Sequence, residues 1–253
     1  MMRTVRLPST FKPKHSFPLI RMGSPRDGGY LVDERLVTSD LISFGISGDW
    51  QFERHWRNRN PSAVIETYDG SISGSKFLLT AFLSLFRPHK PRLVLRNLST
   101  AVEYVTFLKN QTRFNKLFVG NTTQVNWISY QEVTRNTGCG TPFFLKVDIE
   151  GHEYEFLDEI LDRQDILNGL AIEFHQPLTH LETIENFIGR LDLFVCNVHP
   201  NNCLPKNDHR AEPSLEISFS RYEGLGQEPQ VPHDLEADND QTCEAICLQF
   251  EAK

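Results

Sequence analysis

Long hydrophobic runs are missing from the sequence. A helix that crosses a bilayer needs about 20 mostly apolar residues, and the most apolar stretch here, FLLTAFLSLF at 77–86, has about half of that. Basic residues occur within 1–17, but no apolar segment follows them as it would in a secretory signal. We therefore expect no membrane span and no signal peptide, and we expect a cytoplasmic protein.

Cysteine is scarce and shows no pairing pattern. The chain has five cysteines, an odd number with irregular spacing, at positions 139, 196, 203, 243 and 247. Such a set does not indicate a disulfide framework, and no second pair or histidine ladder completes a zinc site. We expect reduced thiols, as in a reducing compartment.

Excess positive charge is also missing. The chain has 26 basic and 33 acidic residues, which gives a formal charge of −7. Nucleic-acid binding depends on lysine and arginine contacts to phosphate, so no nucleic-acid partner is expected. A modest basic patch at Arg87, Lys90 and Arg92 is the exception.

Short apolar, β-branched segments recur along the chain and alternate, in its first part, with helix-like segments. Such strands favour a mostly parallel sheet with helices on both faces, which is an α/β fold. The strand-like segments are 41–46, 63–69, 143–149, 169–174, 193–199, 215–220 and 245–250. The helix-like segments are 49–58, 74–86 and 150–163.

Two regions depart from this alternation. The last two strand-like segments have no convincing helix between them, so we expect an antiparallel, hairpin-like edge. Segment 77–86 is apolar nearly all round, and burial in the core is the simpler explanation of it. We expect a single domain over 1–253, with 1–40 as an N-terminal cap or lid and about 87–116 as an insertion that packs against the domain or covers a substrate.

The first strand ends in SFGISGDW, where Gly45 and Gly48 permit a tight turn and a close approach to a ligand. Asp69 follows the second strand, at the position where an acidic side chain accepts hydrogen bonds from ribose. The dinucleotide fingerprint G-x-G-x-x-G is absent, so a nucleoside without a pyrophosphate fits better. S-adenosylmethionine is the common cofactor of that kind.

A third strand runs into an acidic corner, LKVDIEGHEYEFL at 145–157. Its Asp148, Glu150, Gly151 and Glu153 resemble the D-x-E-G-x-E corner of FkbM-type methyltransferases. Further segments are similar to elements of the methyltransferase-like subgroup of that family, in the expected order and over most of the chain. They are RMGSPRDGGYLV (21–32), SFGISGDWQFE (43–53), AIEFH (171–175), NVHPNN (197–202) and PHDLEADND (232–240).

This resemblance implies a Rossmann-like class I methyltransferase fold, with a mostly parallel seven-stranded sheet, an antiparallel edge and helices on both faces. It implies that S-adenosylmethionine binds along Gly45, Ile46 and Ser47, with its ribose on Asp69 and Gly70, and with Asp148 beside it. It also suggests O-methylation of a hydroxyl group on a small molecule or glycan.

Methyl transfer to a hydroxyl needs alignment and a group that accepts the proton. The candidates at strand ends are Asp148, His175 and His199. Asp148 could instead cap the following helix or bind the amino group of the cofactor, and the two histidines could be structural. Segment RDGGYLV either forms a hairpin or places Asp27 or Tyr30 over the cofactor, and Trp50 with Phe52 favours core packing.

Two other functions remain open on the sequence. Asp148, Glu150, His175 and His199 could converge on a divalent metal, as in a metal-dependent hydrolase on a similar sheet. A noncatalytic binding protein could keep the fold and use 77–86 as a partner-binding helix. The acceptor and the oligomeric state are not indicated by the sequence.

Overall fold

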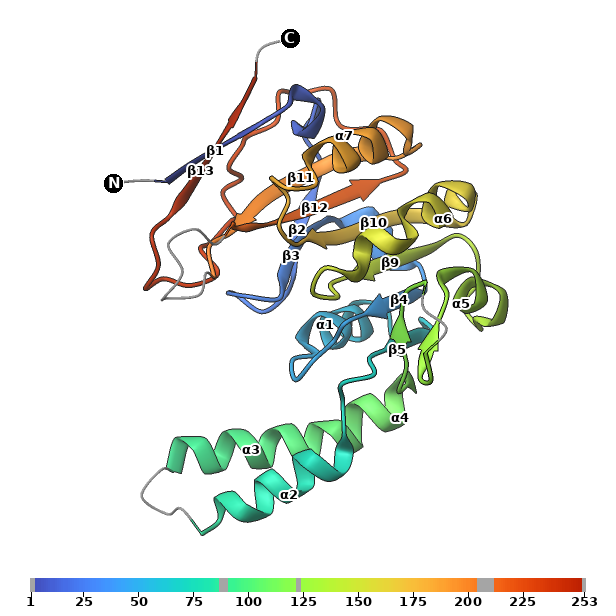
Figure 1. The fold of residues 1–253 in the computed structure, drawn as a ribbon, viewed down its shortest axis with the longest axis vertical. Coiled ribbons are helices and arrows are strands. Elements are labelled where there is room, and N and C mark those ends of the chain that lie inside the picture. The colour runs from blue at the N-terminus through green and yellow to red at the C-terminus, as the bar shows by residue number, and fades with distance from the viewer. Residues whose placement is uncertain (1–2, 87–90, 122–123, 204–211, 252–253) are drawn as a thin grey trace.

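The fold is built around one seven-stranded sheet (Figure 1). The computed structural model describes residues 3–86, 91–121, 124–203 and 212–251. In spatial order the strands are β11 (Phe194–Asn201), β12 (Ser214–Ser220), β10 (Leu167–Phe174), β9 (Phe143–Val147), β4 (Leu41–Phe44), β5 (Ile65–Tyr68) and β6 (Arg113–Asn115). The order reverses beside β4, the first strand of the sheet in the chain, and such a reversal creates a ligand crevice in doubly wound folds.

The pairing confirms the expected α/β fold, with a mostly parallel, seven-stranded sheet and an antiparallel edge. Strands β9, β4, β5 and β6 pair in parallel, and β10 pairs in parallel with β9. Strand β12 runs antiparallel to both β10 and β11, so the antiparallel strand lies next to the edge strand. The expected hairpin of the last two strands is wrong, because β13 (Ile246–Phe250) leaves the sheet and pairs in parallel with β1 (Arg3–Leu7).

Helices cover both faces of the sheet (Figure 1). On one face α5 (Tyr130–Asn136), α6 (Leu157–Asp162) and α7 (Leu181–Arg190) contribute to the larger core cluster. On the other face α1 (Gln51–Arg59) packs with the hairpin of β2 (Leu19–Gly23) and β3 (Gly29–Asp33). The helix expected over 150–163 is broken into a 3-10 turn, η4 (His152–Phe156), and the shorter α6.

Buried aromatic side chains join α1 to the sheet. Trp56 of α1 lies 4.8 Å from Phe144 of β9 between ring centroids, and Phe52 stacks on Trp56 at 5.9 Å. Trp50 and Phe52 are both buried, as expected for packing residues. Because α1 begins directly after the glycine turn of β4, this packing holds that turn in place.

The expected core burial of segment 77–86 is wrong. Helix α2 (Gly74–Ser84) and helix α3 (Pro91–Glu103) form a helical hairpin that extends away from the sheet (Figure 1). A π-helical turn η3 (Tyr104–Leu108) and α4 (Lys109–Gln111) lead from α3 back to β6. The large apolar side chains of α2 are therefore exposed, although the sequence alone suggested a buried helix.

That residues of about 87–116 form an insertion in the domain remains a prediction. Residues 87–90, including Arg87 and Lys90 of the basic patch, lie outside the described residues. At the other end of the range, β6 belongs to the main sheet, and the sequence pattern did not indicate that strand.

Short elements complete the described chain. They are η1 (Ser9–Phe11), η2 (Glu34–Thr38), η5 (Gln164–Ile166), and the parallel pair β7 (Phe118–Val119) and β8 (Trp127–Ile128). The five cysteines are free thiols. Within the described ranges, no helix combines the length and apolar character that a bilayer crossing requires.

Candidate functional site

A cavity of about 1320 Å³ lies at the carboxyl ends of β4, β5, β9 and β10. This is the edge at which parallel α/β sheets bind ligands. Small-molecule sites commonly measure about 300–1,000 Å³, so the cavity has room for a nucleoside cofactor and part of a second substrate. The segment between β2 and β3 adds Ser24, Arg26, Asp27 and Gly28 to its wall. Part of the expected N-terminal cap, within 1–40, therefore borders the cavity.

The turn after β4 brings backbone close to the cavity. Gly45 has φ of +71°, and a Cβ atom there would lie 1.6 Å from the carbonyl oxygen of Asp148. Any other residue at 45 would push the ends of β4 and β9 apart. Gly48 has open space around its Cα, so the turn can approach a ligand without side-chain obstruction.

Asp69 follows β5 and fixes the shape of this turn. Its Oδ2 accepts a hydrogen bond from the backbone N–H of Ser47 at 2.7 Å. Its Oδ1 accepts from the backbone N–H and the hydroxyl of Ser71 at 2.7 and 2.6 Å. A carboxylate has about four lone-pair positions, so about one remains, on Oδ2, for a ligand hydroxyl.

An apolar wall stands beside Asp69, and the sequence reasoning missed it. Phe118 and Trp127 line the cavity and stack with ring centroids 5.1 Å apart. Leu117 and Ile149 also line the cavity. A flat aromatic ring of a ligand would find stacking partners here. The signal available in the sequence was weak, because two-residue strands such as β7 and β8 have no periodicity to recognise.

The opposite side of the cavity is acidic. Tyr30 of β3 donates its hydroxyl toward Oδ2 of Asp148 at 3.0 Å and toward Oε2 of Glu173 at 3.2 Å. Burial, followed by the charges of Asp148 and Glu173, raises the pKa of Tyr30 well above its usual value, so it stays a donor. The sequence left open whether Tyr30 lies over the cofactor. In the structure its hydroxyl bridges two carboxylates.

A buried lysine supplies positive charge to this side. Lys146 of β9 has its Nζ 3.5 Å from Oδ2 of Asp148 and donates to the carbonyl of Gly45 at 3.2 Å. Burial lowers its pKa, but Asp148, Glu53 and Glu173 together raise it above the ordinary value. The ammonium group therefore stays charged inside the protein. The sequence reasoning treated Lys146 only as part of a strand.

Glu173, which the sequence reasoning also missed as a site residue, is 6% exposed at the end of β10. Its Oε1 accepts hydrogen bonds from Asn201 at 3.0 Å and from Ser214. Burial, and then the nearby charge of Asp148, raise its pKa to about 7. Alternation within GLAIEF places Glu173 on one face of the strand, but only the fold shows that this face meets the cavity.

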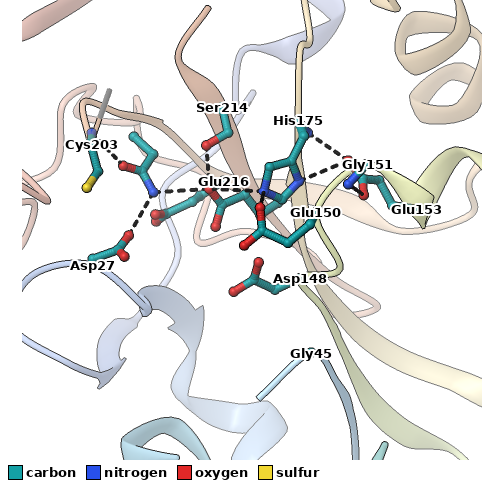
Figure 2. Close-up of polar contacts among 12 residues, drawn as sticks. Asp27, Gly45, Asp148, Glu150, Gly151, Glu153, His175, Cys203, Ser214 and Glu216 are labelled. Carbon is teal, nitrogen blue, oxygen red and sulfur yellow. Dashed lines mark hydrogen bonds and ion pairs between the residues drawn. The ribbon is translucent and has the colours of Figure 1, made fainter. Parts of the chain in front are cut away.

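His175 directly follows β10 and is held by Glu153 (Figure 2). Oε1 of Glu153 lies 2.7 Å from the backbone nitrogen of His175 and 3.1 Å from its Nδ1. Burial lowers the pKa of His175, but Glu153, Glu173 and Asp148 raise it to about 9. At neutral pH the ring therefore carries its proton, which makes His175 a poor initial base.

Three non-glycine residues with positive φ follow neighbouring strands. They are Ser47 after β4 (φ 45°), Glu150 after β9 (φ 56°) and Gln176 after β10 (φ 50°). Such conformations are uncommon for side-chain-bearing residues and tend to collect at functional sites. Their shared position at one edge of the sheet supports the choice of this cavity as the site.

Potential metal ligands also meet here. Asp148, Glu173 and His175 each offer one ligand atom, and these atoms lie within 4.8 Å of one another. A hydrogen bond from Nδ1 of His175 to the Glu153 carboxylate is typical of metal-binding imidazoles. The expected set differs, because this cluster contains Glu173 and lacks Glu150 and His199. The Glu150 side chain is 89% exposed, with its Oε2 3.6 Å from Nε2 of His175.

Most of the predicted site residues line one cavity: Gly45, Ile46, Ser47, Asp69, Asp148 and His175. Two do not. Gly70 is not among the residues that line it, and a Cβ at 70 would lie 2.2 Å from the Phe118 ring. His199 is buried in β11, with Nδ1 2.7 Å from Glu236 and Nε2 2.8 Å from Asn239. The predicted catalytic roles of Asp148, His175 and His199 stay predictions.

Comparisons with known proteins matched methyltransferase structures at low identity. No family model and no curated protein matches the chain. The precorrin-6y C5,15-methyltransferase of Geobacter metallireducens matches with a TM-score of 0.40 and 11% identity, over 72% of this chain and 80% of that chain. A putative RNA methyltransferase of Pyrococcus horikoshii gives 0.40 and 9%, over 74% and 77%. An rRNA methylase of Streptococcus thermophilus gives 0.37 and 10%, over 73% and 88%. At these TM-scores the fold assignment rests on the strand order of the sheet.

We expect His199 to act mainly in stability. Burial lowers its pKa, but the bond to Glu236 raises it to about 9 in the folded protein, above its usual 6.5. The resulting stabilisation is complete below about pH 6.5 and is lost as the pH rises through 9. Melting temperatures from pH 6 to pH 10 should fall along this range in the unmodified protein and fall less in His199→Gln. An equal decline in both proteins would contradict this assignment.

Proposed function

We propose that the chain is an S-adenosylmethionine-dependent methyltransferase of the FkbM type, which methylates a hydroxyl group on a small molecule or glycan. The observation that carries the proposal is that Gly45, Asp69 and Asp148 line one cavity, at the ends of three adjacent strands. The methyltransferase-like sheet and the FkbM-type corner at 148–153 support it. We also retain the expected cytoplasmic location, to which the free thiols conform.

The cavity suits an adenosine without phosphates. The lone-pair position on Oδ2 of Asp69 would accept a ribose hydroxyl, and Phe118 with Trp127 would stack on adenine. The opposite carboxylates, Asp148 and Glu173, would attract the positive sulfonium end of the cofactor. This assignment keeps Gly45, Ile46 and Ser47 along the cofactor. Gly70 would act by letting the chain pass Phe118.

In this function the cofactor supplies an activated methyl group, and the protein aligns the acceptor oxygen behind it. The new bond joins that oxygen to the methyl carbon, the carbon–sulfur bond breaks, and the acceptor proton passes to a base. Glu173 is the strongest candidate for that base, because its pKa of about 7 lies near neutral pH. The charged Lys146 and the Tyr30 hydroxyl would hold Asp148 and Glu173 in position.

Cofactor binding should depend on Asp69. We expect calorimetry to show binding of S-adenosylhomocysteine, and Asp69→Ala to weaken it about 10-fold or more, because hydrogen bonds to charged groups contribute about 1.5–3 kcal/mol. Asp162→Ala, which alters an exposed aspartate on α6, is the matched control and should bind normally. The proposal is rejected if the unmodified protein shows no binding heat at high concentration.

Glu173 should titrate near neutral pH. Carbon-detected NMR of labelled glutamate carboxyl groups should show one group with a pKa of about 7 that disappears in Glu173→Gln and persists in the exposed α7 variant Glu182→Gln. With an acceptor hydroxyl, Glu173→Gln should slow transfer by about 10²–10⁴-fold and retain affinity for S-adenosylhomocysteine, which lacks the sulfonium charge. A titration near pH 4 would remove Glu173 as the proposed base.

The cluster of Asp148, Glu173 and His175 favours a second candidate, a metal-dependent hydrolase. The two functions can be separated by whether the protein binds a nucleoside without a metal. If the methyltransferase proposal holds, S-adenosylhomocysteine should bind equally well after treatment with a chelator, because Asp69 and the Gly45 turn lie outside the cluster. Stoichiometric metal in the purified protein, together with no nucleoside affinity, would favour the hydrolase.

A further inference from the structure

The α2–α3 hairpin leaves a large apolar surface uncovered. Its outward side chains on and after α2, and along α3 and the following turn, are between 42% and 71% exposed. Phe82 and Phe86 contact one another, with ring centroids 5.4 Å apart. Soluble proteins rarely leave such contiguous surfaces without a function. The exposed residues are Leu78, Leu79, Phe82, Leu83, Leu85, Phe86, Leu95, Val102 and Val105.

The two helices bury small side chains and expose large apolar ones, which is the reverse of the usual arrangement in water. The buried residues of α2 and α3 are small: Ala81, Ser84 and Ala101. Small residues between helices and large apolar residues outside are the pattern of helices that associate in lipid. In water the same pair would be expected to turn its leucines and phenylalanines inward, so the pattern points to an apolar environment around the hairpin.

The charge of the hairpin is opposite to that of the chain. Residues 74–86 and 91–111 contain four basic side chains and one acidic one, whereas the whole chain carries −7. The acidic residue, Glu103, is paired with Arg54 of α1 at 3.1 Å. Arg92 and Arg96 lie exposed on the same face of α3 as Leu95 and are spaced one helical turn apart. Apolar residues flanked by arginine and lysine are typical of helices that bind anionic membrane surfaces.

We propose that the α2–α3 hairpin docks on the surface of an anionic lipid bilayer, with its leucines and phenylalanines in the outer part of one leaflet. Eleven residues of α2 span about 16 Å. The hydrocarbon core is about 30 Å thick, so the hairpin cannot cross it. Insertion to the depth of the headgroup boundary covers the apolar face and leaves Arg92 and Arg96 near the lipid phosphates.

The same charges disfavour a second copy as the occupant. In a two-fold dimer the same patch lies on both sides of the interface. Pairing through the hairpin would therefore place Arg92 and Arg96 of both copies in one interface. An anionic bilayer removes this repulsion and covers the apolar side chains at once.

The base of the hairpin is joined to the cavity turn. Phe107 and Leu108 of η3 are buried in one cluster with Ile46 and Trp50. Trp50 also donates its indole N–H to Glu103 at 3.2 Å. Ile46 lines the cavity, so docking of the hairpin would place the cavity in a defined position relative to the bilayer.

Sedimentation with vesicles tests the proposal on the full chain. We expect the protein to bind phosphatidylcholine vesicles that contain phosphatidylserine, and to bind pure phosphatidylcholine far more weakly. The double variant Phe82→Ser with Leu83→Ser should lower binding at least about tenfold, because each loses an apolar group that enters the bilayer. Replacement of Arg92 and Arg96 by glutamine should lower binding about fivefold per residue.

The matched control replaces exposed apolar residues elsewhere, Val125→Ser with Leu225→Ser, and should bind like the unmodified protein. The altered residues are exposed, and unchanged melting temperatures would verify that each variant folds. No vesicle binding overturns the proposal, and so does equal binding to neutral and anionic vesicles. A dimer in analytical ultracentrifugation that Phe82→Ser with Leu83→Ser dissociates would assign the surface to a second copy instead.

Failure of this proposal is separable from failure of the proposed function. The hairpin variants leave Gly45, Asp69 and Asp148 unchanged, so calorimetry with S-adenosylhomocysteine reports on the cavity alone.

Discussion

The structure depends most on how two neighbouring carboxylates, the buried Glu173 and the half-buried Asp148, are held together. Asp148 and Glu173 lie at the ends of neighbouring strands, and both lie within hydrogen-bonding distance of the Tyr30 hydroxyl. Two like charges in a buried site repel one another, so they need compensation. Lys146 supplies a buried positive charge beside Asp148, and its raised pKa reflects the same attraction. Because Tyr30 belongs to the β2–β3 hairpin, this interaction also ties the N-terminal segment to the sheet.

The carboxylate pair explains why the two sides of the cavity differ. The Asp69 carboxylate accepts hydrogen bonds from Ser47 and Ser71, and the neighbouring wall is aromatic, which suits a neutral ring and a sugar. Burial, and then the charge of Asp148, raise the pKa of Glu173 to about 7, whereas for His175 the nearby carboxylates outweigh burial and raise the pKa to about 9. A carboxyl group whose pKa lies near neutral pH, beside a protonated imidazole, is the arrangement expected where protons are transferred. In the proposed function, binding and proton transfer would thus occupy opposite walls.

The hairpin shows where local reasoning about hydrophobicity fails. Segment 77–86 reads as a core helix because its apolar residues surround the helix axis. In the fold it extends away from the sheet (Figure 1), where α2 packs on α3 and the buried residues of the two helices are the small Ala81, Ser84 and Ala101. Nothing in the local pattern separates a buried helix from one that meets lipid, because both environments favour apolar side chains. The position of the segment relative to the sheet makes the distinction.

The sequence by itself determined the alternation of strands and helices, the glycine turn after the first sheet strand, and the acids that follow the second and third. These are local properties, set by side-chain periodicity and by backbone freedom at glycine. It did not reveal the partners of β12 and β13, or the roles of Glu173 and Lys146. Only the tertiary structure decided which strand lies beside which, and therefore which charges are buried together. Pairing and burial depend on contacts between residues far apart in the chain, and no local pattern contains them.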